Sequence, residues 1–229
     1  MSVMRHRART EDQKLFRRQE ILDAAQSHYE DVGYEAFSMA NLAKKSGVAK
    51  GTLYLYFTTR EEVFLALYAQ SLVRWSDQFI EGLTPNMDDH AYSARLHNTA
   101  MAAEGFVSLL VRLEHIIEHN VSFPSIVETK RLFAKRIAAI AKASAPVLGL
   151  TQAQATEVVK ALGVLLIGVS GADQGPNLQG ETVPADVQRF IDGFASEKLF
   201  VTNACFIIRG VRTDNAGGSE DLKGVTHDR

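Results

Sequence analysis

The sequence has little cysteine, little proline and no apolar run long enough to span a bilayer. Its 229 residues include five prolines and a single cysteine, Cys205. One cysteine excludes an intramolecular disulfide and suits a reducing compartment. The longest apolar run, Ala161 to Ala172, falls short of the about 20 residues that a membrane helix needs. The N-terminus is basic but no apolar segment follows it, so it is not a secretory signal. We therefore expect a cytoplasmic protein that makes no contact with a membrane.

Charge is unevenly distributed along the chain, although the formal net charge is only −2. Residues 1–60 hold ten Lys and Arg against seven Asp and Glu, which gives +3. Residues 61–229 hold 15 against 20, which gives −5. A cationic surface that could meet phosphate is therefore concentrated in the N-terminal quarter.

The segment FSMANLAKKSGVAKGTLYLYF, residues 37–57, has the pattern of a helix-turn-helix. Ser38 is a natural N-cap, because its hydroxyl can accept from free N–H groups at a helix start. Gly47 stands where a tight turn needs a positive φ. Ala43 is small enough to let two helices cross closely, and Leu53 supplies an apolar contact from the second helix. The second helix opens at Lys50 with small, basic and aromatic residues, which suit a major groove.

The same residues resemble those of a known family. GVAKGTLYLYF followed by TTREEVFLAL, and RRQEILDAAQSHYEDVGYEAFSM before them, are similar to the DNA-binding domain of TetR-family transcriptional regulators. The resemblance covers about Arg17 to Trp75. It implies a repressor that binds double-stranded DNA at a palindromic operator. It also implies release by a small-molecule effector, and a homodimer formed by the last two helices.

Carried onto this sequence, the motif assigns two kinds of DNA contact. Base edges would be met by Lys50, Gly51, Thr52, Tyr54 and Leu55. Phosphates would be held by Ser38, Tyr56 and Arg60, and such contacts set register without reading sequence. Leu55 departs from many relatives, which carry an aromatic or polar residue there. Leucine can contact a thymine methyl but cannot hydrogen-bond, so base preference at that position stays open.

Apolar periodicity and capping signals predict an all-α fold of nine helices without strands. Thr59-x-x-Glu62 and Thr151-x-x-Gln154 are capping boxes, and Gly33 is a helix stop. The predicted helices are 11–32, the two of the helix-turn-helix (about 38–57), 59–82, 89–103, 105–119, 124–147, 151–169 and 184–211. The domains expected are a basic disordered arm (1–14), a DNA-binding domain (15–75), a helical effector-binding and dimerisation domain (76–212) and a disordered tail (213–229). A loop rich in Gly, Pro, Asn and Asp occupies 171–183.

The predicted helices 151–169 and 184–211 carry more apolar residues than one buried stripe requires. One explanation is a large monomer core. The other is a four-helix interface with a second copy of the chain, which the family resemblance favours. We expect Leu166 and Phe206 to lie in that interface.

One segment, His115-Ile-Ile-Glu118-His119, matches H-x-x-E-H, an inverted zinc-peptidase signature. Histidines at i and i+4 of a helix share a face and could bind Zn²⁺. The pattern is short, and no third ligand is identifiable, so a metalloenzyme or metal sensor stays an alternative. Lining of a ligand cavity or ordinary packing explains the histidines better. We predict no catalytic residue, no resident metal and no cofactor.

No motif identifies the effector site. Candidates for its lining are aromatic or polar residues of the second domain and its boundary: Tyr68, Trp75, Phe106, Arg112, His115 and His119. Arg112 could pair with an anionic ligand or form a surface salt bridge. A third interpretation of the whole chain is a small-molecule-binding helical protein whose helix-turn-helix is vestigial. The sequence identifies neither the operator nor the effector.

Overall fold

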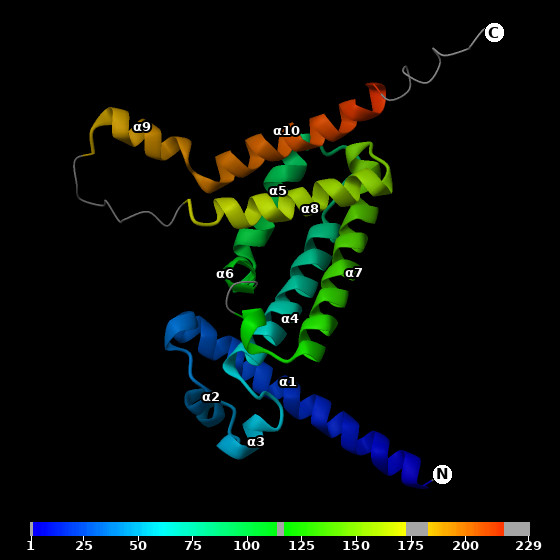
Figure 1. Ribbon diagram of the computed structural model, residues 1–229, viewed down its shortest axis with the longest axis vertical. Helices are drawn as coiled ribbons and strands as arrows, with labels where there is room; N and C mark the ends of the chain where they lie inside the picture. Colours follow the sequence, from blue (N-terminus) through cyan, green and yellow to red (C-terminus); the bar gives the residue numbers. More distant parts are fainter. Residues whose placement is uncertain (1, 114–116, 173–182, 218–229) are drawn as a thin grey trace, which may run out of the picture. The chain divides into compact units, whose positions relative to one another are not determined.

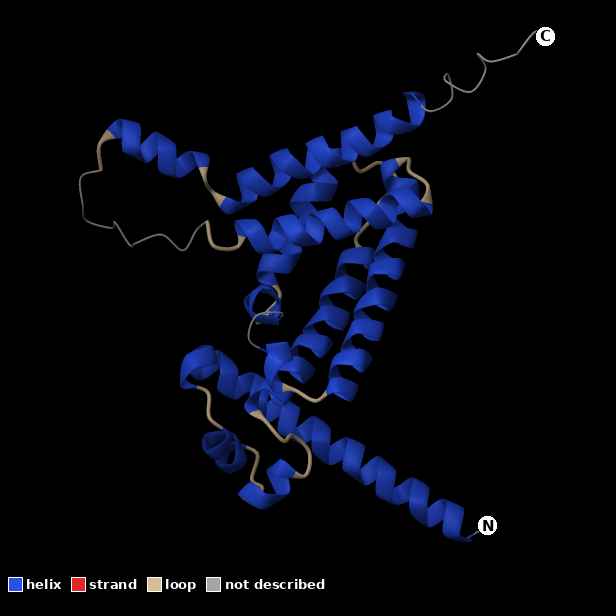
Figure 2. Cartoon of the chain, in the orientation of Figure 1, coloured by secondary structure: helices blue, strands red, loops and turns tan. Residues whose placement is uncertain are grey.

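Every regular element in the described part of the chain is helical (Figures 1 and 2). The computed structural model describes residues 2–113, 117–172 and 183–217, and for 2–10 and 214–217 it describes the backbone alone. The predicted all-α fold is therefore confirmed. Most of the predicted polar loop, 173–182, and the tail from 218 onward lie outside the described residues.

Ten α-helices and one short 3-10 helix make up this part of the chain. They are α1 (Ser2–Ala36), α2 (Met39–Lys45), α3 (Lys50–Tyr54), α4 (Arg60–Glu81), α5 (Asp89–Ala102), α6 (Phe106–Arg112), η2 (Glu118–Asn120), α7 (Phe123–Leu148), α8 (Gln152–Val169), α9 (Ala185–Gly193) and α10 (Ser196–Gly217).

The chain divides into two compact units. Unit 1 contains α1 to α3 and extends to Ser71, and it also takes in Ser108–Leu132. Unit 2 contains Leu72–Val107 and the chain from Phe133 onward. The helices α4, α6 and α7 each contribute residues to both units. The boundary expected after residue 75 falls inside α4, and the domain bounds expected from the sequence stay a prediction.

Aromatic packing forms the centre of unit 1. Ile21, Leu22 and Ala25, which recur at helical spacing on α1, are buried. Phe64 of α4 stacks on the ring of Tyr34, with centroids 4.5 Å apart, and further aromatic rings surround it. Regular helix breaks at Gly33, whose φ of 71° is accessible to glycine without strain. The chain can therefore turn from α1 into α2 at the predicted stop.

Unit 2 is held by an aromatic cluster and by polar ties between helices. The indole of Trp75 stacks on Phe106 at 4.6 Å, and Phe79 meets Tyr92 edge-on at 5.5 Å. The hydroxyls of Tyr92 and Ser144 are 2.8 Å apart, and burial raises the pKa of Tyr92 to about 12. Helix α10 packs against α5 and α8.

A bidentate ion pair ties α10 to α5. The guanidinium of Arg212 donates to both carboxylate oxygens of Asp89, at 3.0 and 2.8 Å, and to the carbonyl of Leu148 at 2.8 Å. It thereby joins the ends of α5, α7 and α10.

Local signals located most helix boundaries correctly. Thr151 and Gln154 form the predicted capping box of α8, with both reciprocal bonds present. The hydroxyl of Thr59 accepts from the N–H of Glu62 at 3.1 Å, and α4 ends at Glu81, directly before the predicted stop at Gly82. Helix α1, in contrast, begins at Ser2 and not near Glu11. No glycine or proline interrupts residues 2–32, so nothing stops the helix from continuing.

Two predicted helices differ from the structure. The helix expected over 184–211 is divided into α9 and α10 after Gly193, because glycine is a poor helix former and Ser196 and Glu197 favour a new helix start. Of the helix expected over 105–119, the structure describes α6, which ends at Arg112, and the 3-10 helix Glu118–Asn120, while residues 114–116 lie outside the described residues. Ten α-helices therefore replace nine in the described part of the chain.

His28 is a buried titratable side chain where α1 meets the helix-turn-helix. Its ring lies 4.8 Å from that of Phe37, and the adjacent Lys45 and Asp31 form an ion pair. Burial lowers the pKa of His28, Lys45 lowers it further, and Asp31 opposes the change. The folded protein therefore favours the neutral ring.

We predict that this histidine makes unit 1 less stable in acid. Below about pH 6.5 the unfolded chain binds a proton that folded His28 resists, so the free energy of unfolding falls as pH decreases through that value. Above it the contribution is constant. His28→Gln should remove this component, which urea unfolding between pH 7.5 and 5.5 would measure. Parallel pH profiles for the parent and the variant would contradict the assignment.

Candidate nucleic-acid interface

The helix-turn-helix forms as the sequence predicts. The hydroxyl of Ser38 accepts from the N–H of Asn41 at 3.2 Å and caps α2. The turn after α2 is closed by Val48, whose N–H donates to the carbonyl of Ala43 at 3.1 Å. Gly47 within it has a φ of 66°. The turn thus directs the chain from α2 into α3, and the two helices pack together.

Helix α3 has only five residues and depends on burial at its inner side. Leu53 is fully buried, and Phe57, just beyond the helix, is almost fully buried. Isolated helices of this length are not stable in water, so tertiary packing must hold α3. Burial of Leu53 and Phe57 fixes which side of the helix faces inward. The remaining side chains are left outward.

The outer side of α3 presents the residues predicted to meet base edges. Lys50, Gly51, Tyr54 and Leu55 are exposed, and Leu55 is 84% exposed. The Nζ atom of Lys50 lies 5.9 Å from the centroid of the Tyr54 ring, so the cation and the phenol are neighbours. Thr52 and Tyr56 are half-buried. A Cβ added to Gly51 would meet no atom within 4 Å, so packing within the protein does not require glycine there.

Arg60, predicted to hold a phosphate, is partly engaged inside unit 1. Its guanidinium carbon lies 4.9 Å from the centroid of Tyr34, and its Nε atom lies 3.1 Å from a carboxylate oxygen of Glu61. Arg112, predicted to line an effector site, lies over the same Tyr34 ring at 5.2 Å and donates to the carbonyl of Ser108. The ring of Tyr34 thus contacts two arginines from distant segments of the chain. The residues around Tyr34 in the sequence do not predict these contacts.

Of the other predicted effector residues, the structure brings two together. Trp75 and Phe106 stack in unit 2, and the indole N–H donates to the hydroxyl of Thr99 at 3.2 Å. Tyr68 is buried in unit 1, and His119 is exposed. His115 lies outside the described residues. These residues therefore do not form one described pocket.

The structure describes only part of the H-x-x-E-H segment. Glu118 and His119 belong to the 3-10 helix η2, and His115 lies outside the described residues. A carboxylate oxygen of Glu118 lies 2.9 Å from the Nζ atom of Lys130. Among the described residues no three His, Cys, Asp or Glu side chains are grouped to hold a metal ion.

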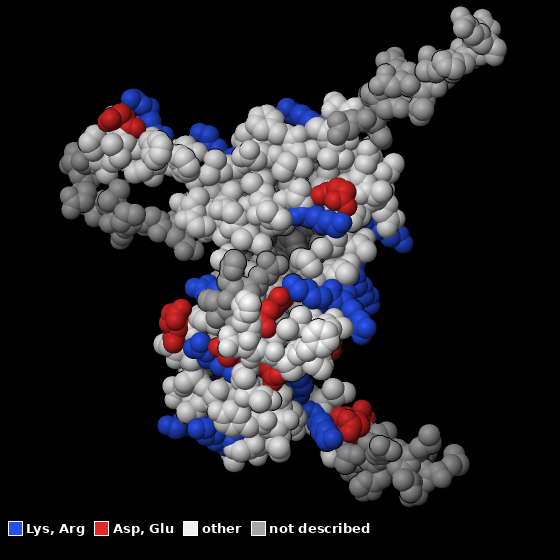
Figure 3. Space-filling view, viewed as in Figure 1, with Lys and Arg blue, Asp and Glu red and all other residues white. Residues whose placement is uncertain are grey.

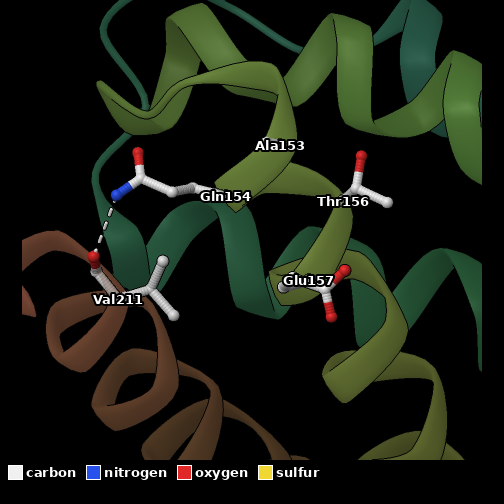
Figure 4. Close-up of a pocket in the computed structure, with 5 residues that line it drawn as sticks. All are labelled: Ala153, Gln154, Thr156, Glu157 and Val211. Carbon is white, nitrogen blue, oxygen red and sulfur yellow. Dashed lines mark hydrogen bonds between the residues drawn. The ribbon is translucent and has the colours of Figure 1, made fainter.

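An open hollow lies where the start of α8 meets α10 (Figure 4). It is lined by Ala153, Gln154, Thr156, Glu157 and Val211. Gln154, the capping residue of α8, donates across it to the carbonyl of Val211 at 3.2 Å. None of the predicted effector residues lines this hollow, and its one cross-helix bond is structural.

Comparison with known families covers both parts of the chain. A model described as "Bacterial regulatory proteins, tetR family" matches residues 21–67. A second, described as "Tetracyclin repressor-like, C-terminal domain", matches residues 69–212. Together they include the helix-turn-helix and nearly all the helices that follow it.

Curated relatives match over part of the chain. The chain is 28% identical over 109 residues to the fatty acid metabolism regulator protein of Bacillus subtilis, which covers 44% of this chain and 54% of that protein. It is 34% identical over 74 residues to the HTH-type transcriptional repressor AcnR of Corynebacterium diphtheriae, covering 32% of this chain and 39% of the relative. The matched segments thus span about half or less of these proteins.

Solved structures share the fold at low sequence identity. A possible TetR family transcriptional regulator from Streptomyces coelicolor has a TM-score of 0.56 at 16% identity, covering 86% of this chain and 99% of that one. A TetR variant from Acinetobacter baumannii in complex with minocycline has a TM-score of 0.50 at 17% identity, covering 84% and 94%. These similarities extend the agreement in fold across both units.

We predict that Lys50 contributes to specific DNA binding. Lys50→Ala should weaken binding to a specific site by roughly 1–3 kcal/mol if the ammonium reads a base edge. Fluorescence titration of labelled duplexes measures the change. Lys142→Ala, which removes the same charge from an exposed position on α7, is the matched control. Equal affinities for the parent and Lys50→Ala would show that the base-reading face is misplaced.

Proposed function

Because the chain belongs to the TetR family of bacterial transcriptional regulators, a non-enzymatic family, we propose that it is a cytoplasmic, ligand-responsive repressor. In this proposal a homodimer binds a palindromic operator and leaves it when a small molecule binds. The observation that carries the proposal is the outward face of α3, described above. The enzyme alternative built on His115, Glu118 and His119 is not retained, since the family is not enzymatic.

We assign base reading to Lys50, Gly51, Thr52, Tyr54 and Leu55. Lys50 and the hydroxyl of Tyr54 can donate to base edges in a major groove, and exposed Leu55 can contact a thymine methyl. The open space beside Gly51 would let DNA approach the backbone. Ser38, Tyr56 and Arg60 are proposed phosphate contacts, with Arg60 also packed on Tyr34.

The proposed dimer uses the outer side of α8 and α10. Val164, Ile167 and Phe206 are 72%, 40% and 62% exposed, although all three are large and apolar. Figure 3 views unit 2 from a side with few charged side chains over these helices. An exposed group of large apolar side chains is typical of a surface that binds another protein. Leu166, expected in the interface, is instead buried within unit 2.

The hydropathy of α8 is consistent with these two packing roles. By length and composition, α8 is the one helix of the described chain apolar enough to cross a membrane. Its inner residues Val158, Leu162 and Leu166 are buried in unit 2. Its outer residues would be covered by the second copy, so a soluble transcription factor accounts for the whole helix.

Effector response would use the helices that contribute to both units. We propose that the ligand binds near Trp75 and Phe106 and shifts the equilibrium towards a dimer whose reading helices no longer match the operator. Tyr68, Arg112, His115 and His119 stay secondary candidates for ligand contact. Helix α4 continues from the packed end of unit 1, at Phe64, to Trp75 in unit 2, so a change at either end can be carried along it. The affinities for ligand and DNA must then oppose each other reciprocally.

Selection from random genomic fragments tests the proposed function directly. The purified protein should enrich fragments that share an inverted repeat, because a symmetric dimer presents the same reading face twice. The Lys50→Ala, Leu55→Ala double variant is the matched control and should lose this enrichment. Fragments without a shared repeat would contradict the proposal and favour a ligand-binding protein with a vestigial helix-turn-helix.

We predict that Phe206→Asp dissociates the dimer without unfolding the chain. Phe206 is exposed in one copy, so only the dimer would bury the new charge. Sedimentation should detect monomers with an unchanged thermal melt, and operator affinity should collapse. Leu166→Asp should instead unfold the chain, because that position is buried, and Lys142→Asp should alter neither property. A parent protein that sediments as a monomer at micromolar concentration would contradict the interface.

A further inference from the structure

The N-terminal part of α1 extends well beyond the core of unit 1. Every side chain from Glu11 to Glu20 is exposed, and Ile21, which follows them, is buried. From Ser2 to Glu20 the helix is roughly 28 Å long at about 1.5 Å per residue. In Figure 1 this blue end of α1 extends away from α2 and α3 of the same unit. Packing within the chain therefore does not account for the turns over residues 11–20.

This extension is strongly cationic. Residues 2–18 contain two acidic residues, Glu11 and Asp12, against six basic ones, which are Arg5, Arg7, Arg9, Lys14, Arg17 and Arg18. Lys14 pairs with Glu11 at 3.1 Å, and Arg17 pairs with Glu20, two residues beyond this segment, at 3.0 Å; both pairs are solvent-exposed. Exposed pairs of this kind are weak. When Glu20 is included, the net charge of residues 2–20 is +3, and it comes from Arg5, Arg7 and Arg9, because the charges of residues 11–20 balance.

The extension leaves unit 1 beside the DNA-reading helix. The guanidinium carbon of Arg18 lies 4.9 Å from the ring centroid of Phe57, which is two residues after exposed Leu55. At the next position along α1, the side-chain carbonyl of Gln19 accepts from the amide of Gln70 on α4 at 2.9 Å. These interactions fix the base of the extension next to α3. Its basic residues are therefore carried on a helix rooted at the face that we assign to DNA.

A membrane surface fits the extension less well than DNA. Helices that lie on bilayers need a continuous apolar stripe. Leu15 and Phe16 are large and exposed but adjacent in sequence, and acidic Glu11 and Asp12 occupy the turn before them. Binding to the phosphates of DNA, in contrast, requires only basic side chains and no apolar stripe.

We propose that residues 2–18 of α1 form a second DNA-contacting element, which binds phosphates outside the base pairs read by α3. The inference rests on the proposed function, since it needs α3 to dock the protein on a site. Phosphate contacts carry no sequence information, so the extension adds affinity and salt dependence without changing the consensus.

The test measures how tightly the full chain binds two DNA duplexes. One duplex contains only the consensus found by the selection, and the other has 15 further base pairs on each side of it. The parent should bind the flanked duplex more tightly. The triple variant Arg5→Gln, Arg7→Gln, Arg9→Gln should bind both duplexes alike, and its salt slope should fall by about 0.9 for each phosphate that it no longer neutralises. Glutamine has nearly the helix propensity of arginine, so the helix is kept. Deletion of residues 2–10 should have the same effect.

The matched control changes Arg74, Lys135 and Lys142, which are exposed in unit 2, to Gln. It should keep the flank dependence of the parent. A parent with no preference for the flanked duplex, or a triple variant that keeps the parent's slope, overturns the proposal while leaving the proposed function intact. Arginine-dependent binding to phosphatidylserine vesicles without flank dependence would assign the extension to membranes instead. A protein that selects no consensus overturns both proposals.

Discussion

The burial of Leu53 is the interaction on which the proposed DNA-reading surface depends. Helix α3 has five residues, about one and a half turns, and is too short to be stable without tertiary contacts. Leu53 and Phe57 hold it against the rest of unit 1, while the turn at Gly47 sets the angle of entry. Because the inner side is fixed by these two side chains, the outward positions of Lys50, Tyr54 and Leu55 follow. The surface proposed to recognise DNA is therefore a consequence of core packing.

In unit 2 the packing leaves apolar side chains exposed. The inner residues of α8 are buried in the core, whereas large apolar side chains on the outer side of α8 and α10 are exposed. A second copy would cover them, and it would also present a second α3. The exposed apolar surface of unit 2 would thereby determine that two copies of α3, related by twofold symmetry, are presented to DNA. The helices shared by both units, α4 above all, offer a route for coupling ligand binding to that symmetry.

Local signals in the sequence were sufficient where local physics decides the structure. The capping box at Thr151 and Gln154, the positive φ of Gly47 and the N-cap at Ser38 all depend on a few neighbouring residues. The outward side of α3 followed from the motif for the same reason. These features could be predicted without knowledge of tertiary contacts.

Tertiary features could not be predicted in the same way. Arg112 was expected near a ligand, yet it lies over Tyr34, 78 positions earlier in the chain. Leu166 and Val164 are both apolar and two residues apart, and only the packing of α8 distinguishes the buried one from the exposed one. The break between α9 and α10 follows Gly193, but one glycine destabilises a helix too little to predict a break by itself. Such outcomes depend on which segments meet.

The central claim is that two copies of the chain present α3 to one face of DNA. Hydroxyl-radical footprinting on a selected operator measures this directly. The account predicts two protected regions related by the twofold axis of the inverted repeat. Their centres should be separated by about 10–10.5 base pairs (about 34–36 Å) or by a multiple of that spacing. A single protected region, or protection on opposite faces of the duplex, would contradict it.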